Sequence, residues 1–555
     1  MKKYLLAAFV FLGFPGFTQI KTSFSPETGE YGQMLSGLEQ AMLKYSEMKT
    51  DTLGGKKRTI FVPWIRDNVH VMKAMKYISR DLTSFLEFYM ENQTEEGLYF
   101  DYYFPLNDGI AQRMNIFDKR YWKIIPRDKI QMHRLPVEAD LEYLVVEGAY
   151  AVWQSTGDVA FVKKWLPVLV RGMNYSMHDR LRWSEKFQLV KRGYTLDTWD
   201  FMQLPTTREE YSRNGGDVQK GIFDINENTP MGIMHGDNSG MYAACNQLSA
   251  MFKIAGNDPE SNAWKHQAEI FRIRTNAACW NGKYYAHFIE DDPQPGYLKM
   301  DQKNTLSLSN PYDINRGLPT EEMAESIIKT YKDLKEANKG KSFAEWYGIY
   351  PPVEPSFAGY KPGSYMNGGV NTIVAGELAT AAFQHGYESY GVDILQRIMQ
   401  LMKKHDGLPV SYTPEGKVDE GIPDNWGQAA VYRAMIEGLA GVVDKGAQFH
   451  AIEISPRWLA AGKNKASVTV AYGPTGSQVN YSYLHDPKKN NISLIVRGEV
   501  TDCTLRILLP PDTKFAGAIV QGKLYNAVIE KVNESNYVVL KGLKGNIIEA
   551  AVKFK

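Results

Sequence analysis

The sequence predicts a mainly α-helical protein built from helical hairpins, followed by a small domain of β-strands. From about residue 31 to 445, apolar residues recur at the spacing of one helix face. Beyond about residue 450 they alternate at period two, with Gly, Pro, Asn and Asp between the runs. We therefore expect a helical domain over residues 20–448 and a β-sandwich over residues 449–555.

The N-terminus has the pattern of an export signal. Lys2 and Lys3 form a short basic region, and Leu5 to Phe14 is an apolar stretch too short to span a bilayer comfortably. A short N-terminal anchor is the alternative, while the absence of a nearby Cys argues against a lipoprotein. We expect a signal peptide over residues 1–19, no later membrane segment, and a mature protein in the periplasm or outside the cell.

Helix faces are clearest in four stretches, at residues 137–152, 241–252, 374–382 and 431–442. Gly157-Asp158 and Gly256-Asn257-Asp258-Pro259 each place a helix-ending Gly just before an Asp that can cap the next helix. Such stops and restarts make antiparallel hairpins. We expect roughly ten or eleven helices, joined in places by long aromatic-rich loops at 98–135, 186–235 and 281–320.

Five period-two runs predict the strands of the C-terminal domain, beginning at Val468, Val479, Ile492, Thr504 and Tyr537. The simplest role for such a domain is structural, as a cap packed against the helical domain. Glycan binding is the alternative.

The charge balance disfavours a nucleic acid as partner. The chain has 64 Lys and Arg against 63 Asp and Glu, so it lacks the one-sided basic field that a polyphosphate needs. Aromatic residues are frequent, at 12%, and such rings either pack cores or stack on the apolar faces of sugars. Cys245, Cys279 and Cys503 are far apart, which predicts buried thiols rather than disulfides or a zinc site.

The first segment that could carry function is Pro63-Trp-Ile-Arg-Asp-Asn68, just before a predicted helix. Asp67 or Asn68 could simply cap that helix. Trp64, Arg66 and Asp67 together, however, supply a stacking platform, a fixed fork of donors and a carboxylate acceptor. A pocket that holds the hydroxyls of one sugar needs these three groups, so we predict that they bind substrate.

The second segment is Gly193-Tyr-Thr-Leu-Asp-Thr-Trp-Asp-Phe201, in which Asp197 and Asp200 flank Trp199. A carboxyl held against an indole loses hydration, which raises its pKa and keeps it protonated as a general acid. An acidic loop beside a core Trp is the alternative interpretation.

The third segment, residues 406–430, brings four acids together before the last long helix: Glu415, Asp419, Glu420 and Asp424. Acids in a solvated loop are ordinary. Glycoside hydrolysis by inversion, however, needs two opposed carboxyls roughly 6.5–9.5 Å apart with a water between them. A loop of acids beside Trp426 is a reasonable source of the second carboxyl.

A further segment, residues 357–370, leads into a helix rich in small residues. Gly368 and Gly369 permit close backbone approach, and Tyr365 is placed to line a cavity. Asn367 could serve only as a cap. We interpret the segment as a rim or binding element.

These segments resemble motifs of the six-hairpin glycosidase superfamily. Trp64-Ile-Arg-Asp67 resembles the Trp-x-Arg-Asp turn that grips the terminal sugar in glucoamylase-like glycosidases, and Trp199-Asp200 resembles the element carrying the general acid in trehalases and processing α-glucosidases. Tyr365–Gly369 and Asn425–Ala430 resemble the starts of the last inner helices. The resemblance implies an (α/α)6 toroid, with an inner and an outer ring of six helices, a pocket at one mouth, and an inverting mechanism without metal or cofactor.

The sequence departs from this pattern in two places. Members often carry a catalytic Glu shortly after a Gly-Leu-Pro-like turn, where this chain has Val410-Ser411-Tyr412. The catalytic base is therefore open between Glu420 and Asp424. Phe201 and the residues after it replace the Ser and Arg of trehalase-like members, which leaves the sugar open.

Three functions follow as hypotheses. The first is an exo-acting glycoside hydrolase acting on an oligo- or polysaccharide, with Asp200 as the acid. The second is a lyase or unsaturated-uronide hydrolase on the same fold, for which His133 and His235 are the candidate groups. The third is a non-catalytic glycan-binding protein, favoured by the missing Glu.

Overall fold

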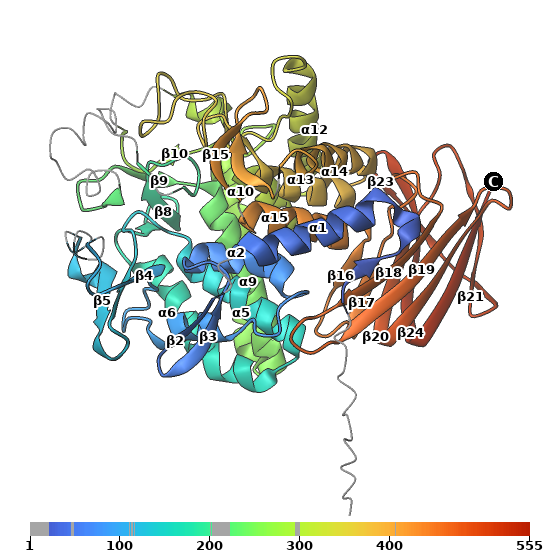
Figure 1. The fold of residues 1–555 in the computed structure, drawn as a ribbon, viewed down its shortest axis with the longest axis horizontal. Coiled ribbons are helices and arrows are strands. Elements are labelled where there is room, and N and C mark those ends of the chain that lie inside the picture. The colour runs from blue at the N-terminus through green and yellow to red at the C-terminus, as the bar shows by residue number, and fades with distance from the viewer. Residues whose placement is uncertain are drawn as a thin grey trace, which may run out of the picture.

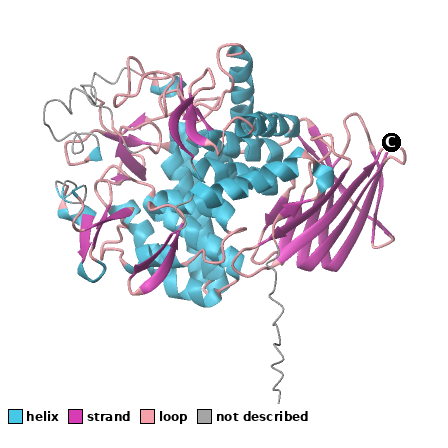
Figure 2. Ribbon diagram, viewed as in Figure 1, coloured by secondary structure: helices cyan, strands magenta, loops and turns pink. Residues whose placement is uncertain are grey.

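The computed structural model describes residues 21–45, 49–109, 112, 115, 117–199, 201–202, 223–294, 300–405, 407–423 and 425–555, with the backbone alone at 49 and 420–423. A body of helices forms one part of the molecule, and a sheet of long strands forms the other, at the right in Figure 1. Helices fill the centre of the body, while short strands lie around its periphery (Figure 2). The predicted signal peptide falls outside the described residues.

Six helices of the body contact one another in a closed cycle, which runs in chain order and closes where the last packs against the first. They are α2 (Ile65–Met75), α5 (Leu141–Thr156), α9 (His235–Ala255), α11 (Ser309–Arg316), α13 (Thr372–Gln384) and α15 (Asn425–Arg433). We call this set the helix ring. Because its helices are surrounded, α13 buries every residue from Thr372 to Phe383, which explains its run of small and apolar residues.

A second set of helices alternates with the ring along the chain. It consists of α1 (Glu30–Tyr45), α3 (Ser84–Glu91), α6 (Val159–His178), α10 (Asp258–Cys279), α12 (Glu321–Ala337) and α14 (Glu388–Met402). These helices bury one face only: in α12 the buried residues are Ala324, Ile327, Ile328 and Tyr331. The described residues thus hold twelve α-helices, more than the ten or eleven expected, because α3 and α11 have only eight residues each.

The predicted hairpin stops are found where expected. Gly157 ends α5 in the left-handed conformation, and the Asp158 side chain accepts from the Phe161 amide to begin α6. Gly256 ends α9 in the same way, but the cap of α10 is Asn257 rather than Asp258. The prediction was wrong there by one residue, because an Asn side chain accepts at the cap as well as Asp.

A short strand precedes every ring helix. These strands are β3 (Lys56–Ile60), β6 (Ile130–His133), β9 (Met231–Ile233), β11 (Leu306–Ser307), β13 (Val370–Asn371) and β15 (Val418–Pro423). They pair in small antiparallel sheets with β2 (Lys49–Leu53), β4 (Tyr102–Pro105), β5 (Trp122–Ile125), β7 (Trp183–Ser184), β8 (Leu189–Gly193), β10 (Ile289–Glu290), β12 (Ile349–Tyr350) and β14 (Pro409–Tyr412). The long segments predicted as loops therefore contain strands, and residues 281–320 also contain α11.

The long sheet has ten strands: β1 (Ser23–Phe24), β16 (Val442–Asp444), β17 (Ala451–Ile454), β18 (Lys465–Ala471), β19 (Gln478–Asp486), β20 (Asn491–Leu508), β21 (Phe515–Val520), β22 (Lys523–Tyr525), β23 (Val528–Val532) and β24 (Ser535–Phe554). Instead of two separate sheets, β20 and β24 run through both halves, with irregular register between Arg497 and Leu505. The sheet begins at Val442, before the predicted boundary, and recruits β1 from the N-terminal side.

The helical body and the long sheet share a buried contact. Tyr77 stacks on Tyr472 with ring centroids 5.5 Å apart, and the Gly473 amide donates to the Lys76 carbonyl at 2.9 Å. The Tyr481 hydroxyl donates to the Ala440 carbonyl at 2.8 Å. The first two contacts join the C-terminal end of α2 to the turn after β18, and the third joins β19 to the segment that follows α15.

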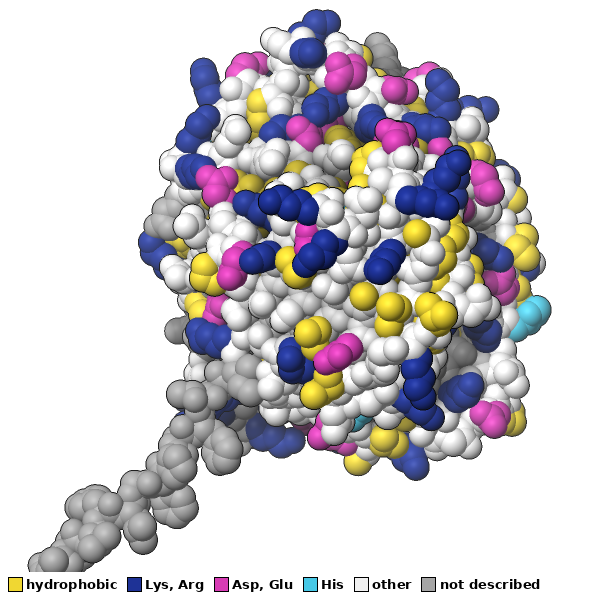
Figure 3. All heavy atoms as spheres, turned by 90° about the vertical axis from the view of Figure 1, so that its right-hand side faces the viewer, with side chains coloured by type: hydrophobic (Ala, Val, Ile, Leu, Met, Phe, Trp, Pro, Cys, Tyr) yellow, Lys and Arg dark blue, Asp and Glu magenta, His cyan; other side chains and the backbone are white. Residues whose placement is uncertain are grey.

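The surface and the cysteines agree with the composition. On the end of the molecule formed by the long sheet, basic and acidic side chains are interspersed (Figure 3). Cys245, Cys279 and Cys503 are free and buried, as predicted. Within the described residues, no helix combines the length and apolarity that crossing a membrane requires.

Candidate functional site

A cavity of about 120 Å³ lies at the N-terminal end of the helix ring. Arg66 and Asp67 come from the first turn of α2, Trp426 from the first turn of α15, and Ile373 from that of α13. We call it the first cavity. Five residues that the sequence predicts to bind substrate line it together: Arg66, Asp67, Trp199, Tyr365 and Trp426.

Arg66 is fixed in place by acids from two loops. Its backbone amide donates to Asp101 Oδ1 at 2.9 Å, and its guanidinium lies 2.9 Å from Asp140 Oδ2 and 3.5 Å from Glu138 Oε1. All four residues are buried. A guanidinium bound by carboxylates keeps a fixed orientation, so little side-chain entropy is lost when a ligand binds beside it.

Sequence reasoning missed Asp101, Glu138 and Asp140. Glu138 and Asp140 stand in an otherwise apolar stretch just before α5. Charged residues in such a stretch are a signal, because acids are rarely buried without a partner. Nothing in the sequence, however, indicates that the partner is Arg66, more than seventy positions away.

Aromatic rings form the walls of the first cavity. The ring centroids of Trp199 and Tyr365 lie 5.3 Å apart at 75°, and Tyr360 contacts both. Tyr365 has a left-handed backbone with φ of 47°, and its amide donates to Asp419 Oδ2 at 2.5 Å. Asp419 also accepts from Ser364 Oγ at 3.0 Å, so this acid of the 406–430 segment positions the Tyr365 wall.

Trp426 contacts two further aromatic side chains. It stacks on His70 with centroids 3.9 Å apart at 8°, and its indole Nε1 donates to the Tyr312 hydroxyl at 2.6 Å. Burial, followed by the nearby cations Lys73, Arg316 and Arg66, holds the pKa of His70 well below its usual range, so this ring is neutral. We call Trp426, His70 and Tyr312 the aromatic floor, since they lie under the first cavity on the ring axis.

Asp197 does not line the cavity. Its carboxylate is buried and accepts from Ser309 Oγ at 2.5 Å, from the Ser309 amide at 3.0 Å and from the Thr198 amide at 2.7 Å. Burial raises its pKa, but His235 and the Ser307 and Ser309 hydroxyls outweigh burial and lower it. The ionised group therefore joins the start of α11 to the segment that carries Trp199.

Trp64 also lies outside the cavity lining and is partly exposed. Its ring packs on Tyr102 with centroids 4.0 Å apart, and Tyr102 stacks in turn on His133 at 5.5 Å. Tyr102 and His133 belong to the sheet of β4, β6 and β5, whereas Trp64 directly precedes α2. The Ile65 amide also donates to the carbonyl of Asp101, the residue before β4.

The structure does not describe the side chains of the three candidate catalytic acids. Asp200 and Asp424 are not among the described residues, and of Glu420 only the backbone is described, paired with Ser411 in the β14–β15 hairpin. Trp199, directly before Asp200, and Trp426, two positions after Asp424, line the first cavity. Among the described residues, no group of three or more His, Cys, Asp or Glu side chains could hold a metal ion.

The Trp199 backbone is held from β8 and α9. Arg192 Nη2 donates to the Trp199 carbonyl at 2.8 Å, and Arg192 Nη1 lies 3.3 Å from Asp237 Oδ1. Both charged residues are fully buried. Burial raises the pKa of Asp237 to about 6 despite the adjacent guanidinium.

No family model matches the sequence, and no curated protein matches it. Solved structures do resemble the fold. The α-L-rhamnosidase of Dictyoglumus thermophilum is 13% identical, with a TM-score of 0.56 over 96% of this chain and 50% of that chain. The GH78 rhamnosidase of Bacillus sp. GL1 is 14% identical, with a TM-score of 0.56 over 87% of this chain and 43% of that chain.

The α-L-rhamnosidase of Aspergillus terreus is 10% identical, with a TM-score of 0.51 over 96% of this chain and 50% of that chain. The chain thus spans about half the length of these enzymes or less. At such identities the likeness concerns the fold.

Proposed function

We propose that the chain is an exported glycoside hydrolase that removes a terminal sugar from an oligo- or polysaccharide, in the periplasm or outside the cell. In this proposal the helix ring and the helices around it are the (α/α)6 toroid of the six-hairpin glycosidases. One observation carries the proposal: Arg66, Asp67, Trp199, Tyr365 and Trp426 come from four distant segments and line one cavity.

The lining suits a single sugar unit. Arg66 presents fixed donors, Asp67 presents acceptors, and the aromatic walls can stack on the apolar face of a pyranose. A cavity of about 120 Å³ leaves little room beyond one ring, which favours attack on a chain end. The rhamnosidases that share the fold are named for removing a sugar, which adds support.

Hydrolysis requires two carboxyls. In the proposed mechanism Asp200 gives its proton to the glycosidic oxygen as the bond to the anomeric carbon breaks. Glu420 or Asp424 takes a proton from a water that attacks the same carbon from the opposite face, which inverts its configuration. The positions of Trp199 and Trp426 in the lining support these assignments, because Asp200 directly follows Trp199 and Asp424 precedes Trp426 by two positions.

The test is product detection with purified protein and a panel of plant, algal and host glycans, including rhamnosides. Chromatography identifies released sugars, and NMR of the first product identifies its anomeric configuration. We expect one monosaccharide with inverted configuration. Asp200→Asn should lower kcat by at least about 10²-fold, because a general acid contributes that much or more. Asp512→Asn, at an exposed acid of the long sheet, is the control and should keep full activity.

Three outcomes would contradict the proposal. Normal turnover by Asp200→Asn would remove the proposed acid, and binding without product would make the chain a glycan-binding protein. An ultraviolet absorbance from unsaturated ends would indicate a lyase. The structure offers little for that chemistry: His235 is buried between Asp313 and Ser307, at 2.5 and 2.9 Å, and His133 is buried against Tyr102. Neither lines the first cavity.

A further inference from the structure

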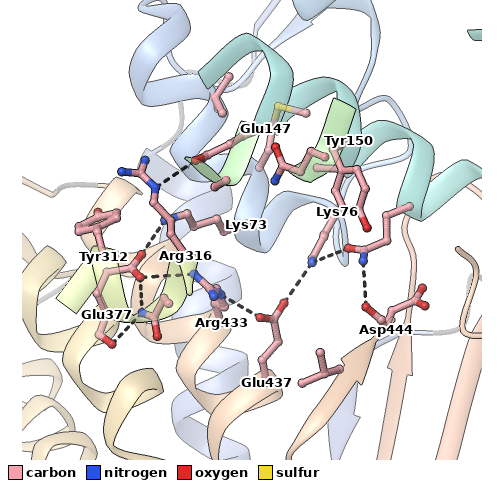
Figure 4. Close-up of a pocket in the computed structure, with 18 of the residues that line it drawn as sticks. Lys73, Lys76, Glu147, Tyr150, Tyr312, Arg316, Glu377, Arg433, Glu437 and Asp444 are labelled. Atoms are coloured by element: carbon pink, nitrogen blue, oxygen red, sulfur yellow. Dashed lines mark hydrogen bonds and ion pairs between the residues drawn. The ribbon is translucent and has the colours of Figure 1, made fainter. Parts of the chain in front are cut away.

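A second cavity, of about 350 Å³, lies inside the helix ring, and all six ring helices contribute to its wall. The aromatic floor stands between the two cavities: Trp426 lines the first, and Tyr312, which accepts its indole hydrogen bond, lines the second. In Figure 4 the charged side chains surround an open centre, and dashed lines join neighbours along the wall. Nothing in the proposed hydrolysis uses this space.

The wall is charge-balanced. Its cations are Lys73, Lys76, Arg316 and Arg433, and its acids are Glu147, Glu377, Glu437 and Asp444. Glu377 pairs with Lys73 at 2.6 Å, Glu437 with Arg433 at 2.8 Å and Glu147 with Arg316 at 3.1 Å. Lys76 also pairs with Glu437, at 3.1 Å. Asp444 has no ion pair among the described residues, but its carboxylate accepts from the Gly446 and Phe449 amides and from the Tyr472 hydroxyl. Because these charges are already bound, an ionic ligand would have to displace a partner and would gain little. A neutral ligand can leave the pairs intact.

Polar groups on the wall still lack protein partners. Among the described residues, Gln247 Oε1 and Asn315 Oδ1 are buried and accept no hydrogen bond. Gln247 lies on α9 and Asn315 on α11, which are neighbours in the ring. Buried acceptors without partners cost free energy unless a water or a ligand donates to them. Both oxygens belong to residues that line the second cavity, so a ligand or water there is a source of the missing donors.

The second cavity is also larger than an ion-pair network needs. At about 30 Å³ for each water, its volume would hold roughly twelve waters. Tyr150 and Tyr312 add aromatic surface to the polar wall. Glu437 lies on η6 (Ala434–Leu439), a π-helical segment that continues α15, and such segments are rare and frequent at functional sites.

We propose that the second cavity is a binding site for a neutral, hydroxyl-rich molecule of monosaccharide size, with water in the rest of its volume. A hydroxyl both donates and accepts, so each one can donate to a carboxylate or amide oxygen and accept from an ammonium or guanidinium group of the wall. The tyrosine rings can cover the apolar face of a sugar ring. This inference goes beyond the proposed hydrolysis and does not depend on it.

The test is calorimetric titration of the full chain with rhamnose, glucose, galactose and the open-chain polyol sorbitol. At least one should bind, and binding should survive in Tyr365→Ala, which removes a wall of the first cavity. Gln247→Leu should weaken ligand binding by about tenfold, which corresponds to the loss of one hydrogen bond. It should not lower the stability of the fold, because the Gln247 side-chain carbonyl accepts no hydrogen bond from the described residues. Ala243→Phe, which fills the cavity, should abolish ligand binding.

Binding by a sugar but not by sorbitol would assign the site to a ring, and the reverse would assign it to an extended polyol. The proposal is overturned if no probe binds, since the cavity then holds water alone. It is also overturned if binding is lost in Tyr365→Ala and unchanged in Gln247→Leu, because the ligand then occupies the first cavity. Neither result bears on the Asp200 experiment, which reads turnover.

Discussion

Arg192 gives the Trp199 segment a fixed position from inside the protein. Its guanidinium pairs with Asp237 and donates a hydrogen bond to the Trp199 carbonyl. The side chains of Arg192 and Asp237 are both fully buried. The residue that carries the proposed acid adjoins this carbonyl in the sequence. The protonation of Asp237 therefore bears on the segment at which the reaction is proposed to occur, since a neutral carboxyl holds Arg192 less strongly.

Asp237 makes the stability of the chain depend on pH. Burial raises its pKa from 3.8 to about 6, so between these values the folded chain holds this proton more tightly than the unfolded chain. Its contribution to stability is fully present below about pH 4 and is lost as pH rises through about 6. Asp237→Asn cannot ionise, so its free energy of unfolding should rise relative to the parent over this range.

Urea unfolding of both proteins at intervals from about pH 4 to about pH 7 measures that difference. Asp512→Asn is the matched control, because the residue is exposed. The difference between its free energy of unfolding and that of the parent should not change with pH. A difference between Asp237→Asn and the parent that stays constant with pH would contradict the assignment of the titration to this carboxyl.

At the scale of single residues, the sequence predicts five of the seven groups that we expected to bind substrate, while Trp64 and Asp197 of the same motifs lie outside the cavity lining. Arg66, Asp67, Trp199, Tyr365 and Trp426 all reach the first cavity. What it does not predict is which acids position them. Asp140 and Asp419 reach their partners only through the fold, and a single sequence carries no record of such pairs.

The ring helices α13 and α15 approach so closely that a side chain does not fit between them. A Cβ on Gly376 would lie 2.5 Å from the carbonyl carbon of Ala430 and 2.5 Å from the amide nitrogen of Val431. Both are backbone atoms, which cannot swing aside as the end of a side chain can. Gly376 therefore sets the distance between the helices that carry Glu377 and Trp426.

Gly376→Ala should destabilise the fold by about 1–3 kcal/mol or more, because overpacking outweighs the gain of up to about 1 kcal/mol in helix propensity. The free energy of unfolding in urea measures it. Gly37→Ala on α1 is the matched control: its Cβ would meet only the Met402 methyl at 3.2 Å, so the effect should be neutral or stabilising. Equal effects of the two substitutions would show that the close approach does not matter.

At the scale of elements, the long helices follow from period and punctuation, as the α5–α6 and α9–α10 hairpins show. The short strands before the ring helices do not. Strands such as β11 and β13 have two residues each, too few for a period to appear. Their place is set by the ring helices that they precede, which is tertiary information.

At the scale of the molecule, the sequence marks the change from helix to strand near residue 450 but not how the parts join. Strand β1, near the N-terminus, pairs with β18 of the long sheet, and its Phe24 ring packs edge-on against Trp458 with centroids 5.3 Å apart. Two residues at one end of a chain carry no pattern that points to a strand at the other. The long sheet is thus completed by both ends of the described chain.

The contact between the helical body and the long sheet should make them unfold together. A Cβ on Gly473 would lie 2.3 Å from the Ser79 carbonyl oxygen, so the turn between β18 and β19 packs directly against the segment that follows α2. We expect a single calorimetric transition for the parent chain, because Tyr77, Tyr472 and Tyr481 lie buried in this contact and would be exposed if either part opened alone.

Gly473→Ala should weaken the contact by about 1–3 kcal/mol and lower or split the transition. Gly517→Ala, in β21 of the same sheet, is the control, since its Cβ meets no atom within 4 Å. Two separate transitions in the parent chain would show that the body and the sheet are independent folding units, and that this contact does not couple them.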